Sequence, residues 1–153
     1  MNRNAGFDTR SQIFFMLISG GIFAYFGFAS TWAHQYTTTS PPQLLPMVVL
    51  LKWALRGGAI AFGVSALIAL TGSLLGPLLY AVVGLITAVI FAVVAVWEWT
   101  NPQGYYSGVP AILLIIFAAW NGFGSYSSLR EILSARRIAS RIEPPTPRYN
   151  RPL

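Results

Sequence analysis

The chain has 153 residues, of which 55% are hydrophobic and 9% are charged, whereas soluble domains average about 25% charged residues. This composition excludes an ordinary soluble globular domain and indicates one small membrane domain. Without a cysteine, the chain has no disulfides, thiolate metal sites, iron–sulfur clusters or cysteine nucleophiles. The net charge of +6 lies mainly in the two tails, so anionic lipid rather than nucleic acid is the expected partner.

The first predicted span covers residues 13–33, which carry no charge and follow a polar tail at residues 1–12. About 20 apolar residues suffice to cross a bilayer as a helix. A secretory signal peptide is the alternative, because Thr31-Trp32-Ala33 loosely resembles a cleavage site. The apolar part of a signal peptide runs for only about 7–15 residues, and the tail here includes Asp8. We therefore expect a retained membrane anchor.

Residues 57–97 contain no aspartate, glutamate, lysine, arginine or histidine. As one helix they would extend over roughly 60 Å, twice the roughly 30 Å thickness of the hydrocarbon core. The chain must therefore cross the membrane twice here, and it can turn back only at Thr71-Gly72-Ser73 with Gly76-Pro77. This predicts a transmembrane hairpin with spans at about 48–71 and 77–97.

Lys52 and Arg56 fall in the second predicted span, one helical turn apart. A central lysine or arginine costs about 2.5–3.5 kcal/mol on insertion scales, whereas one near a helix end extends its charge into the headgroups. We therefore place both residues in the outer turns of this span, where snorkelling removes most of the cost.

The fourth predicted span, at about 110–128, continues into a basic amphipathic helical extension at about 129–142. Prolines at positions 46, 77 and 110 are each expected at the first helical position of the last three spans. The arginines of the extension are expected to contact anionic lipid headgroups, at about 1 kcal/mol each; they are Arg130, Arg136, Arg137 and Arg141. Residues 143–153 are expected to form a flexible proline-rich tail, which leaves residues 13–142 as the membrane domain with its juxtamembrane helix.

The orientation in the membrane follows from the positive charges. Eight of the ten basic residues lie in the two tails, which four spans place on one side of the membrane. By the positive-inside rule both termini are cytoplasmic. Aromatic residues gather at the opposite boundary: Trp32, Tyr36, Trp53, Trp97, Trp99, Tyr105 and Tyr106. The expected location is the plasma membrane or a bacterial inner membrane.

Small residues recur every four positions in the predicted hairpin, and the first and fourth spans contain further small residues. These stripes are Gly20, Ala24 and Gly27; Gly57, Ala61, Ser65 and Ala69; Gly84, Ala88 and Ala92; and Ala111, Ala118 and Gly122. Such residues let helix backbones approach closely in lipid. Packing within the bundle is the favoured interpretation, and a dimer face is the alternative. The two halves of the chain also share a tryptophan, a proline-containing loop and an apolar helix, which leaves an internal duplication open.

Two groups of polar residues are candidate sites. Lys52, Arg56 and Glu98 share the outer boundary, where they form either an anion site gated by an Arg56–Glu98 salt bridge or only snorkelling charges and a structural ion pair. Asn121 lies deep in the fourth span and is expected to hydrogen-bond another helix, with Thr87 and Ser65 as partners.

Other candidates are weaker. The single histidine, His34, has no further ligands near it for a metal or haem, so no cofactor is expected. The glycines at 57–63 enter lipid and lack the preceding strand that a phosphate-binding loop requires.

No catalytic constellation is present, and the four predicted spans hold no carboxylate. We therefore expect no enzyme and no proton-coupled transporter. The favoured function is a structural or accessory membrane protein that packs with itself or with a larger complex. The alternative is an oligomeric anion transporter or pore that uses Lys52 and Arg56. Fold class alone does not decide between them.

Overall fold

A computed structural model describes residues 9–30, 45–101 and 109–142 of the chain. In this part the fold is all-helical, as predicted. The elements are α1 (Thr9–Ala24), which continues into the short π-helix η1 (Tyr25–Ala29), then α3 (Leu45–Leu70), α4 (Leu75–Thr100) and α5 (Ala111–Ile142).

Four helical stretches are long and apolar enough to cross a membrane. They are Arg10–Ala29, Pro46–Leu70, Leu75–Thr100 and Ala111–Ser134. The prediction of four helices long and apolar enough to cross a membrane is confirmed, but the last of these stretches ends at Ser134 rather than at residue 128. Nothing interrupts α5 there, and Leu129, Ile132 and Leu133 keep the stretch apolar around its charged residues.

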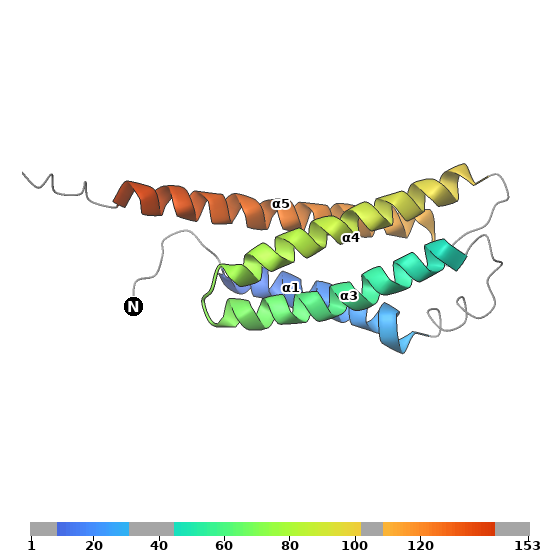
Figure 1. The fold of residues 1–153 in the computed structure, drawn as a ribbon, viewed down its shortest axis with the longest axis horizontal. Coiled ribbons are helices and arrows are strands. Elements are labelled where there is room, and N and C mark those ends of the chain that lie inside the picture. The colour runs from blue at the N-terminus through green and yellow to red at the C-terminus, as the bar shows by residue number, and fades with distance from the viewer. Residues whose placement is uncertain (1–8, 31–44, 102–108, 143–153) are drawn as a thin grey trace, which may run out of the picture.

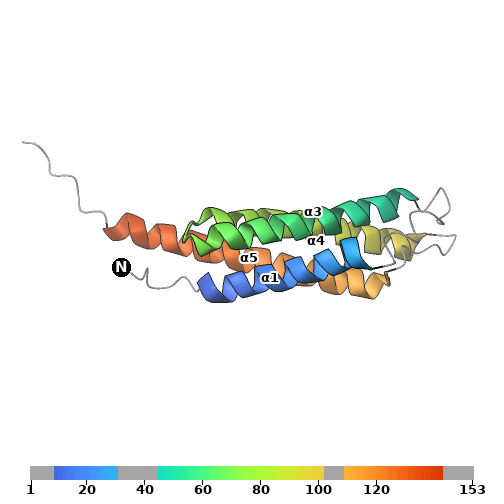
Figure 2. The same cartoon turned by 90° about the horizontal axis from the view of Figure 1, so that it is seen from below.

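The helices lie side by side in an up-and-down arrangement (Figures 1 and 2). At one end, which we call the hairpin end, lie the α3–α4 turn, the start of α1 and the final part of α5. The opposite end is called the loop end. α3 packs against both α1 and α4, and α4 packs against α5, whereas α1 and α5 touch only at a few points. The bundle is therefore open between its first and last helices.

The turn between α3 and α4 lies where the glycine and proline pattern predicts it. Gly72 adopts a φ of +78°, a backbone conformation that glycine reaches without strain. Its N–H donates to the Ala69 carbonyl at 2.9 Å, and the Leu75 N–H donates to Ser73 Oγ at 3.2 Å. The last groups of α3 and the first groups of α4 thus find partners within four residues of chain.

The closest backbone approach in the bundle occurs just after this turn. A Cβ atom built on Gly76 would lie 2.6 Å from both the Ala69 nitrogen and the Ser65 carbonyl oxygen. Ser65 and Ala69 are buried at 0% and 2% exposure, whereas Gly57 and Ala92 are exposed. In the stripes of α3 and α4, the members near the hairpin end therefore serve packing within the chain, and the members near the loop end are exposed.

Aromatic side chains fill the space between α1, α3 and α4. The Phe23 ring lies 5.3 Å from the Phe62 ring and 5.4 Å from the Phe91 ring, centroid to centroid, and Tyr80 lies 5.2 Å from Phe62. All four side chains are at most 2% exposed. Tilted and edge-on contacts of this kind add to the dispersion energy that holds helices together in lipid.

At the loop end, Trp53 and Trp99 are exposed and Trp97 is half-buried. The other members of the predicted aromatic boundary lie outside the described residues, as do His34, residues 1–8 and residues 143–153. The predictions that concern those residues stay predictions.

Candidate functional site

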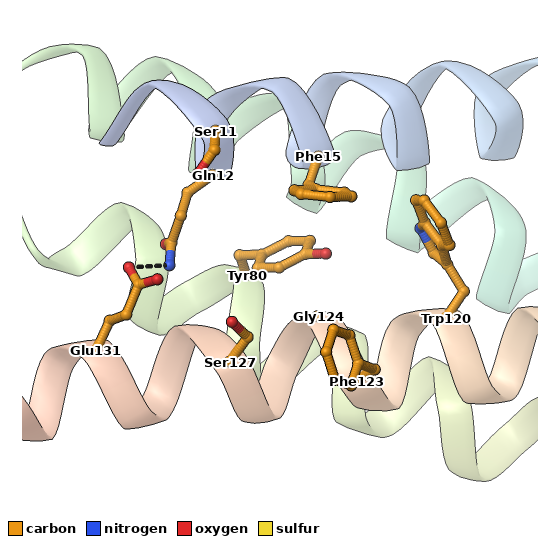
Figure 3. A pocket seen from close by; sticks show the side chains of 9 residues that line it. All are labelled: Ser11, Gln12, Phe15, Tyr80, Trp120, Phe123, Gly124, Ser127 and Glu131. Carbon is orange, nitrogen blue, oxygen red and sulfur yellow. Dashed lines mark hydrogen bonds between the residues drawn. The ribbon is translucent and has the colours of Figure 1, made fainter. Parts of the chain in front are cut away.

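A cavity of about 170 Å³ lies between α1, α4 and α5 in the half of the bundle next to the hairpin end (Figure 3). It occupies the gap left by the weak contact between α1 and α5. The cavity is lined by Ser11, Gln12 and Phe15 of α1, Tyr80 of α4, and Trp120, Phe123, Gly124, Ser127 and Glu131 of α5. Aromatic rings form most of its wall, and hydroxyl, carboxamide and carboxylate groups gather at one end.

The polar end of the cavity is built by a chain of hydrogen bonds that joins three helices. Gln12 Nε2 donates to Glu131 Oε2 at 2.7 Å. Ser128 Oγ lies 3.0 Å from Gln12 Oε1 and 3.1 Å from the Pro77 carbonyl oxygen, and its hydroxyl can donate to either. Gln12 is only 7% exposed, so these bonds satisfy a carboxamide that would otherwise be buried at a cost.

A second bridge between α1 and α5 lies deeper in the bundle. Trp120 Nε1 donates to Ser19 Oγ at 3.2 Å, and the Trp120 ring lies 5.4 Å from the Phe15 ring, centroid to centroid. Long side chains, rather than close backbones, thus span the distance between these helices. That spacing leaves room for the cavity.

Tyr80 projects from α4 into the middle of the cavity. The residue is 2% exposed, and its hydroxyl has no hydrogen-bond partner among the described residues. The hydroxyl rests against Gly124, where a built Cβ atom would collide with it. In Figure 3 the hydroxyl points away from the Gln12–Glu131 pair, toward Trp120. A buried phenol without a partner costs free energy, which a ligand or a water molecule bound there would recover.

Sequence reasoning missed this cavity. The expectation that no span holds a carboxylate depended on ending the third span at residue 97 and the fourth at residue 128, but the candidate spans continue to Thr100 and Ser134 and include Glu98 and Glu131. That expectation is therefore corrected. The available signal was a glutamate set among Leu129, Ile132 and Leu133 on a helix with no break before it.

At the loop end, the structure gives Arg56 a specific place. Its Nε donates to the Gly27 carbonyl oxygen at 2.8 Å, and its guanidinium lies over the Phe28 ring at 5.1 Å from the centroid. Lys52 and Glu98 are half-buried. The Arg56–Glu98 salt bridge and the anion site stay predictions, and the contacts with Gly27 and Phe28 of η1 already give Arg56 a structural role.

A second cavity of about 130 Å³ lies in the loop half of the bundle and is lined by apolar side chains of η1, α3, α4 and the start of α5. Neither cavity is lined by Lys52, Arg56 or Glu98. These two spaces therefore give no support to the anion site.

Asn121 is fully buried, and its hydrogen bond differs from the one expected. Its Nδ2 donates to the Phe117 carbonyl oxygen at 2.8 Å, within α5. Thr87 and Ser65 likewise donate to carbonyl oxygens of their own helices, those of Gly84 and Ala61. The structure places all three side chains in the interior but directs each donor to its own backbone. Asn121 Oδ1 has no partner among the described residues.

Replacing Asn121 by leucine is expected to change the free energy of unfolding by less than about 1 kcal/mol. Removing an unpartnered buried carbonyl offsets the lost local hydrogen bond and the added bulk. Titration with SDS in mixed micelles, followed by circular dichroism, measures this change. A loss above about 2 kcal/mol would instead indicate that Asn121 bonds another helix, as the sequence suggested.

The basic residues of α5 lie toward its C-terminal end. Arg130, Arg136 and Arg137 are exposed, and Arg141 lies in the helix with a side chain outside the described set. Their contact with lipid headgroups stays a prediction. Within the described residues, no group of three or more histidine, cysteine, aspartate or glutamate side chains could hold a metal ion.

A scan of protein-family models and searches of curated proteins and of solved structures yield no match. What the chain does must therefore be inferred from its own residues.

Proposed function

We propose that the chain is an accessory membrane protein that packs sideways against a transmembrane helix of a partner protein, with α5 as the contact helix. The supporting observation is the burial of the four spans. Only 22% of the most apolar window of α5 is buried within the chain, against 44% for α3 and for α4. α5 packs closely against α4 and meets α1 only through long side chains, so the side of α5 turned away from α4 is free to meet a partner.

The face of α5 turned away from α4 has the spacing of a helix–helix contact. Exposed residues on this face are separated by four and three positions in turn. We call them the outer stripe, which consists of Ile112, Ile116, Ala119, Phe123 and Tyr126. This alternation keeps side chains along one side of a helix over several turns. Ala119 lies at the centre of the stripe, where a small side chain allows a second backbone to approach closely.

The proposed orientation places the hairpin end and both termini in the cytoplasm. α5 continues eight residues beyond the candidate span, from 135 to 142. Arg136 and Arg137 are exposed on this extension. Cytoplasmic basic residues of this kind agree with the positive-inside rule and are drawn to anionic lipids.

Single-cysteine variants test the proposal directly, since the natural chain contains no cysteine. Ala119→Cys and Tyr126→Cys, labelled with a benzophenone maleimide and irradiated in native membranes, are expected to yield one adduct of defined higher mass. Ile60→Cys and Leu67→Cys are matched controls, because these residues of α3 are 62% and 66% exposed. Mass spectrometry of the adduct identifies the partner.

Equal labelling from α3 and α5 would contradict the assignment of α5 as the contact helix. An adduct composed only of two copies of this chain would overturn the partner-protein proposal in favour of a homo-oligomer.

A further inference from the structure

From the geometry of the cavity between α1 and α5 we infer that it binds a small aralkylamine, a protonated amine joined to an aromatic body that carries a hydrogen-bonding oxygen. This inference does not depend on the partner helix proposed above, although Phe123 belongs both to the outer stripe and to the lining of the cavity.

The charge of the cavity selects a cation. Glu131 is the one charged residue among those that line it. Its carboxylate accepts the Gln12 amide, and a carboxylate has room for more than one donor. An ammonium group at the polar end would form a charge-assisted hydrogen bond with Glu131.

The size and wall of the cavity select an aromatic body. At about 170 Å³ the space slightly exceeds an engineered apolar cavity of about 150 Å³ that holds one benzene molecule. Phe15 and Trp120 offer rings for a tilted or stacked contact. The remaining walls are largely apolar, so a body of one aromatic ring fits better than a polar chain.

The unpartnered hydroxyl of Tyr80 selects an oxygen on the ligand. This hydroxyl is buried inside the cavity and points away from Glu131. A ligand with its ammonium at Glu131 and a hydroxyl or ether at the far end would satisfy both groups at once. Such a ligand would also relieve the cost of the buried phenol.

The route into the cavity runs from the lipid side. Trp120 and Phe123, which both line the cavity, are 43% and 76% exposed on the surface of the bundle. A ligand that enters here must first dissolve in the bilayer, as aralkylamines do when the amine is neutral. This route excludes permanently hydrophilic cations.

The test uses the full chain in nanodiscs of neutral phosphatidylcholine, with equilibrium dialysis of tritiated tyramine. Unlabelled phenethylamine, which lacks the phenol oxygen, and 3-(4-hydroxyphenyl)propionate, which is an anion, serve as competitors. Tyramine is expected to bind about fivefold more tightly than phenethylamine, and the anion is expected not to compete.

Two variants assign the contacts. E131Q is expected to weaken tyramine binding by about tenfold or more, since hydrogen bonds to charged groups are the stronger ones. E98Q, at the loop end, is the matched control and should bind as the natural chain does. Y80F should bind phenethylamine normally but lose the preference for tyramine. Because the Tyr80 hydroxyl meets no hydrogen-bond criterion with any of the described residues, Y80F remains informative even if E131Q fails to fold.

Unchanged binding in E131Q, a tyramine preference that survives in Y80F, or equal binding of the anion would overturn the inference. So would the absence of tyramine binding at millimolar concentration. Water alone would then be the occupant of the cavity.

Discussion

Replacing Gly76 by valine is expected to lower the free energy of unfolding by about 3 kcal/mol, the largest effect of any single substitution proposed for this chain. The built Cβ of Gly76 meets the Ala69 nitrogen and the Ser65 carbonyl oxygen, which are both backbone atoms. Backbone atoms cannot rotate away as the end of a side chain can. The valine variant must therefore push α3 and α4 apart at the point where they are most closely packed.

Gly63→Ala is the matched control for this substitution. Gly63 lies in the middle of α3, and a Cβ atom built there has no other atom within 4 Å. Alanine favours a helix over glycine by about 1 kcal/mol, so this variant should be as stable as the natural chain or more so. SDS titration in mixed micelles, monitored by circular dichroism, compares the two variants. Equal stability of the valine variant and the control would show that the α3–α4 contact is looser than described.

The helical architecture was predictable because lipid imposes one dominant constraint. A charge-free helical stretch twice as long as the bilayer is thick must fold back as a hairpin within the membrane. Gly72 lies at the turn of this hairpin and has a positive φ. The end of the helix at Ile142 was predicted correctly, but the end of the membrane span within α5 was predicted less well. Arginine and glutamate near residue 130 suggested a boundary, but a helix leaves the membrane without any change in backbone, so the helix itself does not mark that position.

The candidate site was predicted less well than the fold, because it depends on how helices are paired. Gln12 and Glu131 are 119 positions apart, and only the topology brings the start of α1 to the end of α5. The polarity of Asn121 and its depth in the span predict that it faces the interior, which is correct. They do not reveal that the side chain bonds the Phe117 carbonyl of its own helix.

Arg56 shows a related difference between a residue's position and its contacts. Its position near the loop end was predicted, but its hydrogen-bond partner was not. The Gly27 carbonyl oxygen is available to Arg56 because η1, which continues α1, ends close by. There the Ser30 N–H donates to the Tyr25 carbonyl oxygen at 2.8 Å, and Ser30 Oγ donates to the Phe26 carbonyl oxygen at 2.9 Å. The last turn of a helix leaves carbonyl oxygens without hydrogen-bond donors. Arg56 of the neighbouring helix α3 provides such a donor to the Gly27 carbonyl oxygen.

Replacing Arg56 by alanine is accordingly expected to cost about 2 kcal/mol. The Gly27 carbonyl loses a charged donor, which is worth about 1.5–3 kcal/mol, and the stack on Phe28 contributes roughly 0.5–1 kcal/mol more. Amide hydrogen exchange should accelerate at the end of α1 and remain unchanged at the hairpin end. Arg136→Ala, on the exposed extension of α5, is the control and should leave both stability and exchange unaffected.

A double-mutant cycle with Phe28→Ala separates the two contributions. Coupling of about 0.5–1 kcal/mol between Arg56 and Phe28 would measure the ring contact alone, and the remainder of the loss would belong to the Gly27 carbonyl. If Arg56→Ala left the protein within about 0.5 kcal/mol of the natural chain, the guanidinium would not be holding α1 to α3. Its charge would then be available at the loop end, which is the condition that the anion-site hypothesis requires.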